Sequence, residues 1–268
     1  MALKWIHTII FRKIRRRLLF ESEVNKMNSN EKDFGTNYGT ILFWNVDTQY
    51  DFMRSDESFN GALPVGGARV IEENLEKLTS IAEKYELKVV NTADWHTMDD
   101  TEISLNPDFK RTYPQHCMQG TKGAQYISAT DPKDPLIVSW KDKAFNTESI
   151  SGNRNILLYK NKFDAFEGNP YTKTILDMIN PDTVIVYGVA TNICVDMAVQ
   201  GLVKNKKEVY VVKDAIKELP NEIAATSLEM ITDSWKKEHV KFIETKDVEK
   251  FVRKNELNKT VDMLRSEN

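Results

Sequence analysis

The chain of 268 residues has little cysteine, no long apolar run and no excess of basic charge. Its two cysteines, Cys117 and Cys194, cannot build a disulfide framework, and no signal peptide with a small-residue cleavage site is visible. We therefore expect a reducing, cytoplasmic compartment. The absence of a long apolar run excludes a membrane-spanning helix, and a net charge of −3 provides no basic surface for nucleic acid.

The length suffices for one large domain with a well-buried core, and no linker divides the chain after residue 40. We therefore expect one domain over residues 40–268, preceded by a basic, flexible extension over residues 1–39. Residues 1–20 carry six Lys and Arg and no acidic residue. As an amphipathic helix they would suit an anionic membrane surface or an organelle address. The favoured interpretation is an accessory extension, with Met27 opening the globular part.

Short apolar stretches alternate with helical patterns from Thr40 onward. Strands are predicted at several of these stretches, including 41–46, 88–92, 155–159 and 183–187. Helices are predicted at 68–85, at 171–179, after Cys194, from about Pro220 and from about Asp247. The alternation predicts an α/β fold with a doubly wound, mainly parallel six-stranded sheet and helices on both faces.

The stretch 184–199 predicts a buried strand, a tight turn and a helix N-terminus that carries Cys194. A thiol in the first turn of a helix meets the positive end of the dipole and unpaired backbone N–H groups. Both favour a thiolate and can hold an oxyanion. The stretch also fits an inert buried cysteine, which is the commoner state for a single cysteine beside a strand.

Polar residues follow the predicted strands at the points where the strands end. In a doubly wound sheet the site lies beyond the carboxyl ends of the strands, and these ends present Asp47, Asp94, His96, Lys160 and Cys194. Each residue alone could be a cap or part of a surface ion pair. Their coincidence at successive strand ends favours a reaction centre in which a carboxylate takes the thiol proton and a lysine holds the thiolate.

A metal site is a second interpretation of the same strand ends. Asp94 and His96 alternate along the chain, and His116 lies in the long polar connection 97–135, which could fold back over them. One carboxylate and two imidazoles suit zinc, manganese or iron(II). The spacing alone is weakly specific, because an Asp-x-His pair is more often part of a surface loop.

Five motifs, in order over residues 40–216, resemble the isochorismatase-like cysteine hydrolases and, within them, the nicotinamidases (pyrazinamidases). The motifs are Val46-Asp47-x-Gln49-x-Asp51-Phe52, Asp94-Trp95-His96, Pro114-x-His116-Cys117-x-x-Gly120-Thr121-x-Gly123-Ala124, Lys160-x-x-Phe163-x-Ala165-Phe166 and Gly188-Val189-Ala190-Thr191-x-x-Cys194-Val195. The assignment to the nicotinamidases rests on the cysteine, which true isochorismatases lack, and on the metal set, which the N-carbamoyl amidases of this superfamily generally lack.

The resemblance implies a three-layer α/β/α fold and a role for each matching residue. Asp47 is the implied general base and acid, Lys160 the third member of the triad, and Cys194 the nucleophile. The peptide before Ala190 is the implied cis bond, and the N–H groups of Ala190 and Cys194 form the implied oxyanion hole.

The same resemblance implies one divalent metal ion, with zinc favoured over manganese or iron. Its ligands would be Asp94, His96 and His116, and Phe52 and Tyr113 match positions where the family places aromatic side chains against the substrate ring. A further ligand stays open, and its candidates are Glu102, which is the nearest, and Asp99, Asp100 and Asp108.

The implied activity is hydrolysis of nicotinamide to nicotinate and ammonia through a cysteine thioester, a step of NAD salvage. A first alternative keeps the mechanism but changes the substrate to another small amide, ureido or carbamoyl compound. A second is a non-catalytic member that binds a pyridine or a partner protein. The oligomeric state, a homo-oligomer included, stays open.

Overall fold

The computed structural model describes residues 39–220, 224 and 226–266. The predicted extension therefore lies outside the described residues except for Gly39. The chain divides into one unit formed by Thr40–Lys246 and another that includes Asp247–Asn268. In the part of the chain that is described, no helix is both long and apolar enough to cross a membrane.

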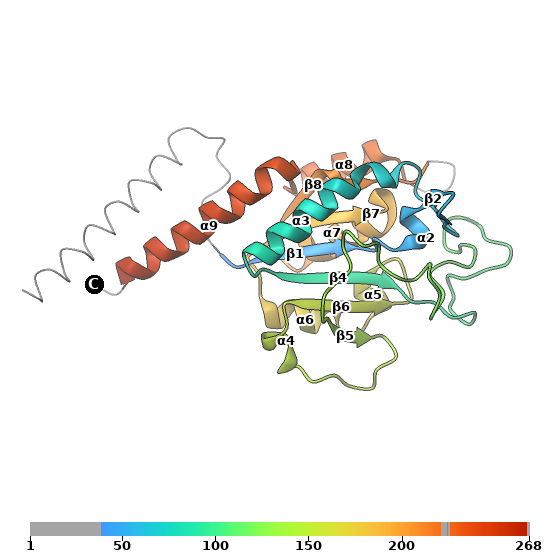
Figure 1. The fold of residues 1–268 in the computed structure, drawn as a ribbon, viewed down its shortest axis with the longest axis horizontal. Coiled ribbons are helices and arrows are strands. Elements are labelled where there is room, and N and C mark those ends of the chain that lie inside the picture. Colours follow the sequence, from blue (N-terminus) through green and yellow to red (C-terminus); the bar gives the residue numbers. More distant parts are fainter. Residues whose placement is uncertain (1–38, 221–223, 225, 267–268) are drawn as a thin grey trace, which may run out of the picture. The chain divides into compact units, whose positions relative to one another are not determined.

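One parallel sheet of seven strands organises residues 40–246 (Figure 1). Its order is β5-β6-β4-β1-β7-β8-β9, and every neighbouring pair is parallel. The strands are β1 (Ile41–Val46), β4 (Lys88–Asp94), β5 (Leu136–Ser139), β6 (Asn155–Lys160), β7 (Thr183–Val189), β8 (Glu208–Lys217) and β9 (Lys241–Ile243). The predicted fold class is confirmed. The sheet has seven strands, one more than the six predicted.

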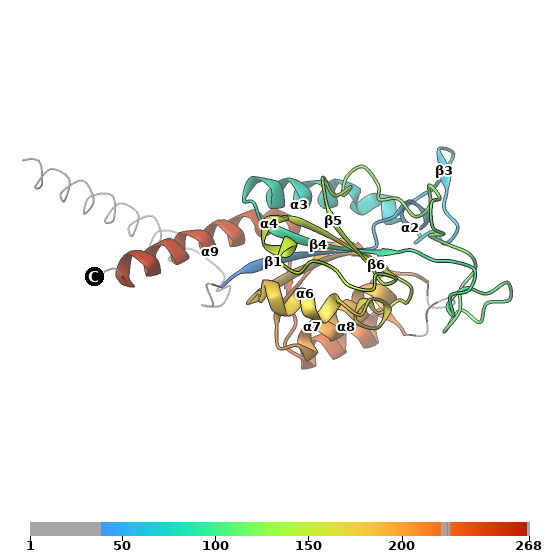
Figure 2. The same ribbon diagram turned by 90° about the horizontal axis from the view of Figure 1, so that it is seen from below.

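Helices cover both faces of the sheet, with α3 on one side and α6, α7 and α8 on the other (Figure 2). The helices are α2 (Tyr50–Met53), the 3₁₀ turn η1 (Ala68–Ile71), α3 (Glu72–Lys84), α4 (Ser149–Gly152), α5 (Ala165–Gly168), α6 (Thr172–Ile179), the π turn η2 (Thr191–Val195), α7 (Asp196–Lys204), α8 (Leu228–Lys237) and α9 (Thr245–Ser266). The helix predicted from about Pro220 begins only at Leu228. Ser227 caps it, and the Ser227 hydroxyl accepts the N–H of Met230 at 3.3 Å. A small antiparallel hairpin, β2 (Ser55–Asp56) and β3 (Phe59–Asn60), follows α2.

A large hydrophobic core lies between the sheet and the helices α6, α7 and α8. Alternate residues of β1 point into it, including Leu42 and Trp44, because successive side chains of a strand face opposite sides. From α7, Val199 and Leu202 meet them, both fully buried. Each such side chain contributes roughly 1.5–3 kcal/mol by leaving water, so this face fixes α7 and the turn that precedes it.

The chain changes direction across the sheet beside β1. It runs from β1 to β4 on one side and returns later to β7 on the other side of β1. The crevice outside the carboxyl ends of the strands at such a switch point is where open α/β sheets bind ligands. A ligand site is therefore expected at the carboxyl ends of β1, β4, β6 and β7.

Gly188 allows β7 to pass close to β1 near this crevice. Its φ is 121°, and a Cβ there would lie 2.1 Å from the carbonyl oxygen of Val46. We expect Gly188→Ala to lower the free energy of unfolding by roughly 2 kcal/mol or more, because alanine must adopt a strained φ or push the two strands apart. Urea unfolding measures the change. The control is Gly152→Ala, where an added Cβ meets nothing within 4 Å; an equal loss in both variants would contradict the argument.

Candidate active site

Four neighbouring strands, β6, β4, β1 and β7, present the predicted polar residues at their carboxyl ends. Lys160 is the last residue of β6 and pairs in register with Asp94, the last residue of β4. Asp47 directly follows β1, and Cys194 follows β7. The structure therefore brings together the four side chains that the sequence placed at separate strand ends.

Lys160 lies at the centre of this group. Its Nζ is 2.9 Å from Oδ2 of Asp47 and 3.9 Å from Sγ of Cys194, and it also forms an ion pair with Oδ1 of Asp94. Each of these four residues is buried. One ammonium group thus stands between two carboxylates and a thiol, where water screens their charges little.

Burial and mutual charge shift the pKa values of these groups. Burial raises the pKa of Asp47, and it raises the pKa of the Cys194 thiol well above its usual value despite the nearby ammonium group. Burial opposes the charge of Lys160, but the carboxylates of Asp47 and Asp94 outweigh it and raise the pKa of Lys160 well above its usual value. Desolvation is the larger effect on this thiol and opposes the thiolate that the helix dipole would favour.

Asp47 is held in an uncommon backbone conformation by β4. Its φ is 49°, which is rare for a residue other than glycine. The Asp47 N–H donates to the Thr92 carbonyl at 3.0 Å, and the Thr92 hydroxyl donates to Oδ1 of Asp47 at 2.6 Å. These two bonds leave Oδ2 directed toward Lys160.

A single π turn delivers Cys194. The Val189–Ala190 peptide is cis, as the resemblance implied. After it, the N–H of Val195 donates to the Ala190 carbonyl at 3.1 Å, a bond that spans five residues. The sequence predicted an α-helical first turn at this point, whereas α7 begins only at Asp196. Such π turns are frequent at functional sites.

Asp94, His96 and His116 form a second buried cluster, with one ligand atom of each lying within 4.8 Å of the others. Nε2 of His116 is 3.6 Å from Oδ2 of Asp94, and Nε2 of His96 is 3.8 Å from Oδ1. The loop that carries His116 lies beside the His96 strand extension, because the His96 N–H donates to the Cys117 carbonyl at 3.1 Å. The long connection thus folds back as predicted.

The surroundings of the two imidazole rings fit the binding of a divalent metal. Nδ1 of His116 lies 2.7 Å from the Pro114 carbonyl and acts as the donor, which leaves Nε2 with a lone pair toward Asp94. Both ring nitrogens of His96 are buried without a hydrogen-bond partner, and its Nδ1 is 3.4 Å from Oδ2 of Asp100. Buried polar atoms without partners are rare, so Nε2, which is the nitrogen that faces Asp94, suits a metal ion that completes the cluster.

The candidates for a further ligand occupy other positions. Asp100 lies behind His96, and Asp108 accepts three backbone N–H bonds in an exposed turn. Glu102 is buried; one oxygen accepts the Phe163 N–H at 3.0 Å and the other has no partner. Burial and the charge of Asp94 raise the pKa of Glu102 to about 8. None of these candidates joins the cluster of Asp94 and the two histidines.

A narrow, largely apolar cleft opens beside both clusters. Its lining consists of Phe52, Leu63, Val65, Asp94, Tyr113, His116, Phe163, Ala190, Ile193, Cys194 and Leu219. The ring centres of Phe52 and Tyr113 lie 5.4 and 6.3 Å from that of His116. The predicted aromatic residues therefore stand at the metal-side wall.

Three apolar residues of this lining, Leu63, Val65 and Leu219, had no signal in the sequence. They lie in loops without periodic patterning, so only the folded chain assigns them to the cleft. Leu219 is fixed by Asn192, whose side chain accepts the Leu219 N–H at 2.9 Å and donates to its carbonyl at 2.9 Å. This pair ties the cleft wall to the π turn of the cysteine.

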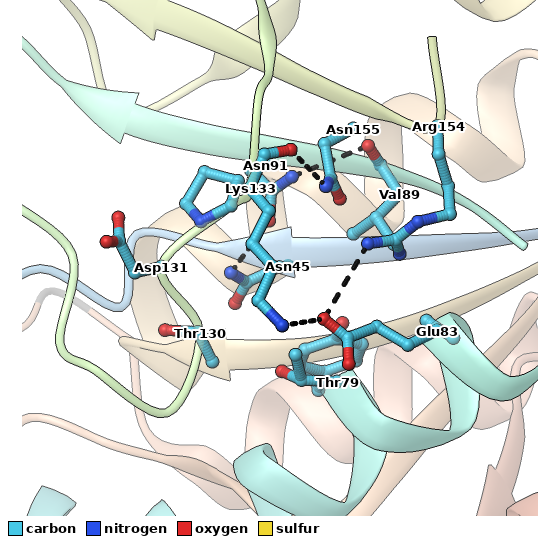
Figure 3. A pocket seen from close by; sticks show the side chains of 13 residues that line it. Asn45, Thr79, Glu83, Val89, Asn91, Thr130, Asp131, Lys133, Arg154 and Asn155 are labelled. Carbon is cyan, nitrogen blue, oxygen red and sulfur yellow. Dashed lines mark hydrogen bonds and ion pairs between the residues drawn. The ribbon is translucent and has the colours of Figure 1, made fainter. Parts of the chain in front are cut away.

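A second cavity lies between α3 and the sheet (Figure 3). Asn45 donates to Asn91 at 3.0 Å on its floor, and Glu83 pairs with Lys133 at 2.8 Å and with Arg154 at 3.9 Å at its mouth. Neither the cysteine nor the histidines line it. Several of its polar side chains bond to one another or to the nearby backbone, which fits a packing role.

Comparison with known proteins finds matches to the part of the chain that carries the sheet and the candidate site. A family model described as the isochorismatase domain matches residues 41–247. The nicotinamidase/pyrazinamidase of Mycobacterium tuberculosis is 27% identical over 164 residues, which are 60% of this chain and 77% of that protein.

Two solved structures illustrate the shared fold. The pyrazinamidase of Pyrococcus horikoshii in complex with zinc has a TM-score of 0.58 and 23% identity, and the match covers 76% of this chain and 98% of that chain. The N-carbamoylsarcosine amidase of Thermoplasma acidophilum has a TM-score of 0.57 and 21% identity, over 77% and 96% of the two chains. At these identities the likeness extends to the fold alone.

Proposed function

This chain belongs to the isochorismatase family, and from that premise we propose that it is an amidohydrolase that converts nicotinamide to nicotinate and ammonia. One observation carries the proposal: the buried group of Asp47, Lys160 and Cys194 and the cluster with two histidines meet at one narrow apolar cleft. A relative named nicotinamidase/pyrazinamidase supports the choice of substrate.

The first half of the proposed reaction forms a thioester. Asp47 takes the proton of the Cys194 thiol, and its raised pKa suits it to hold that proton. The thiolate attacks the amide carbon, and the N–H groups of Ala190 and Cys194 receive the charge that develops on the amide oxygen. The ammonium group of Lys160 stays close to both the sulfur of Cys194 and the carboxylate of Asp47 while the negative charge passes from Asp47 to the sulfur.

The second half releases both products. Asp47 returns the proton to the amide nitrogen, so ammonia leaves and the acyl group stays on Sγ of Cys194. Asp47 is then a carboxylate again and takes a proton from a water molecule that attacks the thioester carbon. The C–S bond breaks, nicotinate leaves, and the proton on Asp47 returns to the cysteine.

Substrate binding would use the opposite wall of the cleft. Asp94, His96 and His116 would hold one divalent ion, which would supply a Lewis-acid position for the ring nitrogen of the substrate. We assign zinc first, because a relative of the same fold is described in complex with zinc. Phe52 and Tyr113 would pack against the ring.

Removal of the metal is expected to raise the KM for nicotinamide by roughly tenfold or more. Alkylation of Cys194 by iodoacetamide should slow much less, because Lys160 and Asp47 still surround the thiol. Chelated and metal-restored samples are compared in both assays. Equal losses in the two assays would show that the ion activates the nucleophile, contrary to the proposed division of roles.

The charge of the cleft separates nicotinamide from the first alternative. Among the described residues that line the cleft there is no arginine or lysine to receive a substrate carboxylate. The apolar side chains therefore suit an aromatic ring, and a substrate carboxylate would find no cationic partner there other than the proposed metal ion.

Ammonia release from nicotinamide by the metal-loaded protein tests the proposal, with N-carbamoylsarcosine and benzamide beside it. Release from nicotinamide alone, or from nicotinamide far above the others, is the expected result. If ammonia were released from another amide but not from nicotinamide, nicotinamide would be rejected as the substrate in favour of that amide. Binding of nicotinamide without any turnover would favour a non-catalytic member.

A further inference from the structure

We propose that Asp51 is a positioning residue that sets His116 for metal binding through the peptide N–H of Cys117. Asp51 belongs to α2 and lies outside the cluster of Asp94, His96 and His116. The inference rests on the metal site of the proposed function, but it does not depend on which amide the enzyme hydrolyses.

The carboxylate of Asp51 joins two loops. Its Oδ2 accepts the N–H of Cys117 at 2.6 Å, and its Oδ1 accepts the N–H of Ala62 at 3.0 Å. The residue is only 6% exposed, so both bonds form with little competition from water. Hydrogen bonds from backbone N–H groups to a buried carboxylate are short and strong, so Asp51 holds both loops firmly.

Cys117 connects this carboxylate to both histidines. It directly follows His116, and its φ of 44° is a conformation that residues other than glycine seldom adopt. Its N–H is held by Asp51, and its carbonyl accepts the N–H of His96 at 3.1 Å. One peptide segment therefore fixes the distance between the two imidazoles, and Asp51 fixes that segment.

The neighbouring backbone leaves room for the carboxylate. The N–H of Asp51 donates to the Gly123 carbonyl at 3.0 Å, and a Cβ on Gly123 would lie 2.2 Å from Oδ2 of Asp51. Any side chain at position 123 would therefore displace the carboxylate from the Cys117 N–H. Gly123→Ala thus perturbs the same contact without removing the charge.

The principal test is Asp51→Asn in the full chain, titrated with cobalt(II) in competition with a chelator. The amide oxygen can accept one of the two backbone N–H groups, but its NH₂ then faces the other donor. We expect a roughly tenfold to hundredfold loss of cobalt affinity and a changed visible absorption spectrum of the bound ion. Iodoacetamide labelling of Cys194 in the metal-free protein should stay at the parental rate.

Two further variants complete the test. Gly123→Ala should reproduce the loss of affinity, and it also serves if Asp51→Asn does not fold. Asp214→Asn is the matched control, because Asp214 on β8 likewise accepts a backbone N–H, that of Thr245 at 2.8 Å. It should bind cobalt like the parent.

Three outcomes would overturn the proposal. Parental cobalt affinity and spectrum in Asp51→Asn would show that Asp51 does not position His116. A parallel loss of Cys194 labelling would show a general structural role. Failure of the parent protein to bind cobalt would refute the metal site itself, whereas failure to hydrolyse nicotinamide with intact cobalt binding would refute only the substrate.

Discussion

Cys194→Ala is expected to lower the rate of nicotinamide hydrolysis by about 10⁴-fold or more. The sulfur is the atom that would carry the acyl group, and no other thiol or aliphatic hydroxyl group lines the described part of the cleft. Without it, neither the thioester nor the proton transfer to Asp47 can occur. Ammonia release at saturating nicotinamide measures the loss.

The chain offers a matched control for this substitution. Cys117 is its other cysteine; it is also buried, and burial raises its pKa well above the usual value. Cys117→Ser should retain hydrolysis, because the bonds that Cys117 makes to Asp51 and His96 use only its backbone. Cys194→Ala should still bind metal and nicotinate. Hydrolysis by Cys194→Ala at the parental rate would refute the thioester mechanism.

Lys160→Met is expected to lower the free energy of unfolding of the metal-free protein by about 3–5 kcal/mol at neutral pH. It should also abolish hydrolysis. The substitution keeps a buried side chain of similar length but leaves the carboxylates of Asp47 and Asp94 facing each other without a cation. Urea unfolding and ammonia release measure the two losses.

The deficit of this variant should shrink as the pH falls. In the parent, the ammonium group helps to hold the pKa of Asp94 well below its usual value, while burial raises that of Asp47. Without the ammonium group, burial and mutual repulsion raise the pKa of both carboxyls in the folded state. When the pKa of a carboxyl is higher in the folded than in the unfolded protein, the free energy of unfolding falls as the pH rises. The fall begins near the unfolded pKa, about 3.9, and continues through the folded pKa. The variant therefore approaches the parent below that window.

An exposed lysine provides the comparison. Lys173 pairs with Asp177 on the surface of α6, and surface pairs contribute only about 0–1 kcal/mol. Lys173→Met should therefore unfold almost like the parent. If Lys160→Met were equally stable, the buried ion network would not hold the strand ends together.

The candidate site could be predicted from the sequence to the extent that its signals were local. Asp47 and Lys160 each follow a mostly apolar run, and Asp94 follows the strand that begins with Val89 and Val90; a polar residue in such a place marks a strand end. The motif around His116 identified a loop member of the metal set, although its spacing from His96 is long. The structure brings these side chains together, and their chemical roles stay predictions.

Other parts of the site could not be read from local pattern. The π turn at Cys194 cannot be told from an ordinary helix start in the sequence. The apolar spacing of α7 that follows would be the same in either case. Leu63 and Leu219 are loop residues whose contact with the cleft depends on distant partners such as Asn192. The late start of α8 at Leu228 depends on the Ser227 cap, which the hydrophobic pattern overlooked.

The sequence by itself determined the alternation of strands and helices and the polar residue at each strand end, because both follow from hydrophobic periodicity over a few residues. Only the tertiary structure decided that β6, β4, β1 and β7 are neighbours. Strand order in a parallel sheet depends on crossover connections and on hydrogen bonds between distant segments. For the same reason, the sharing of Asp94 between Lys160 and the two histidines becomes visible only in the folded chain.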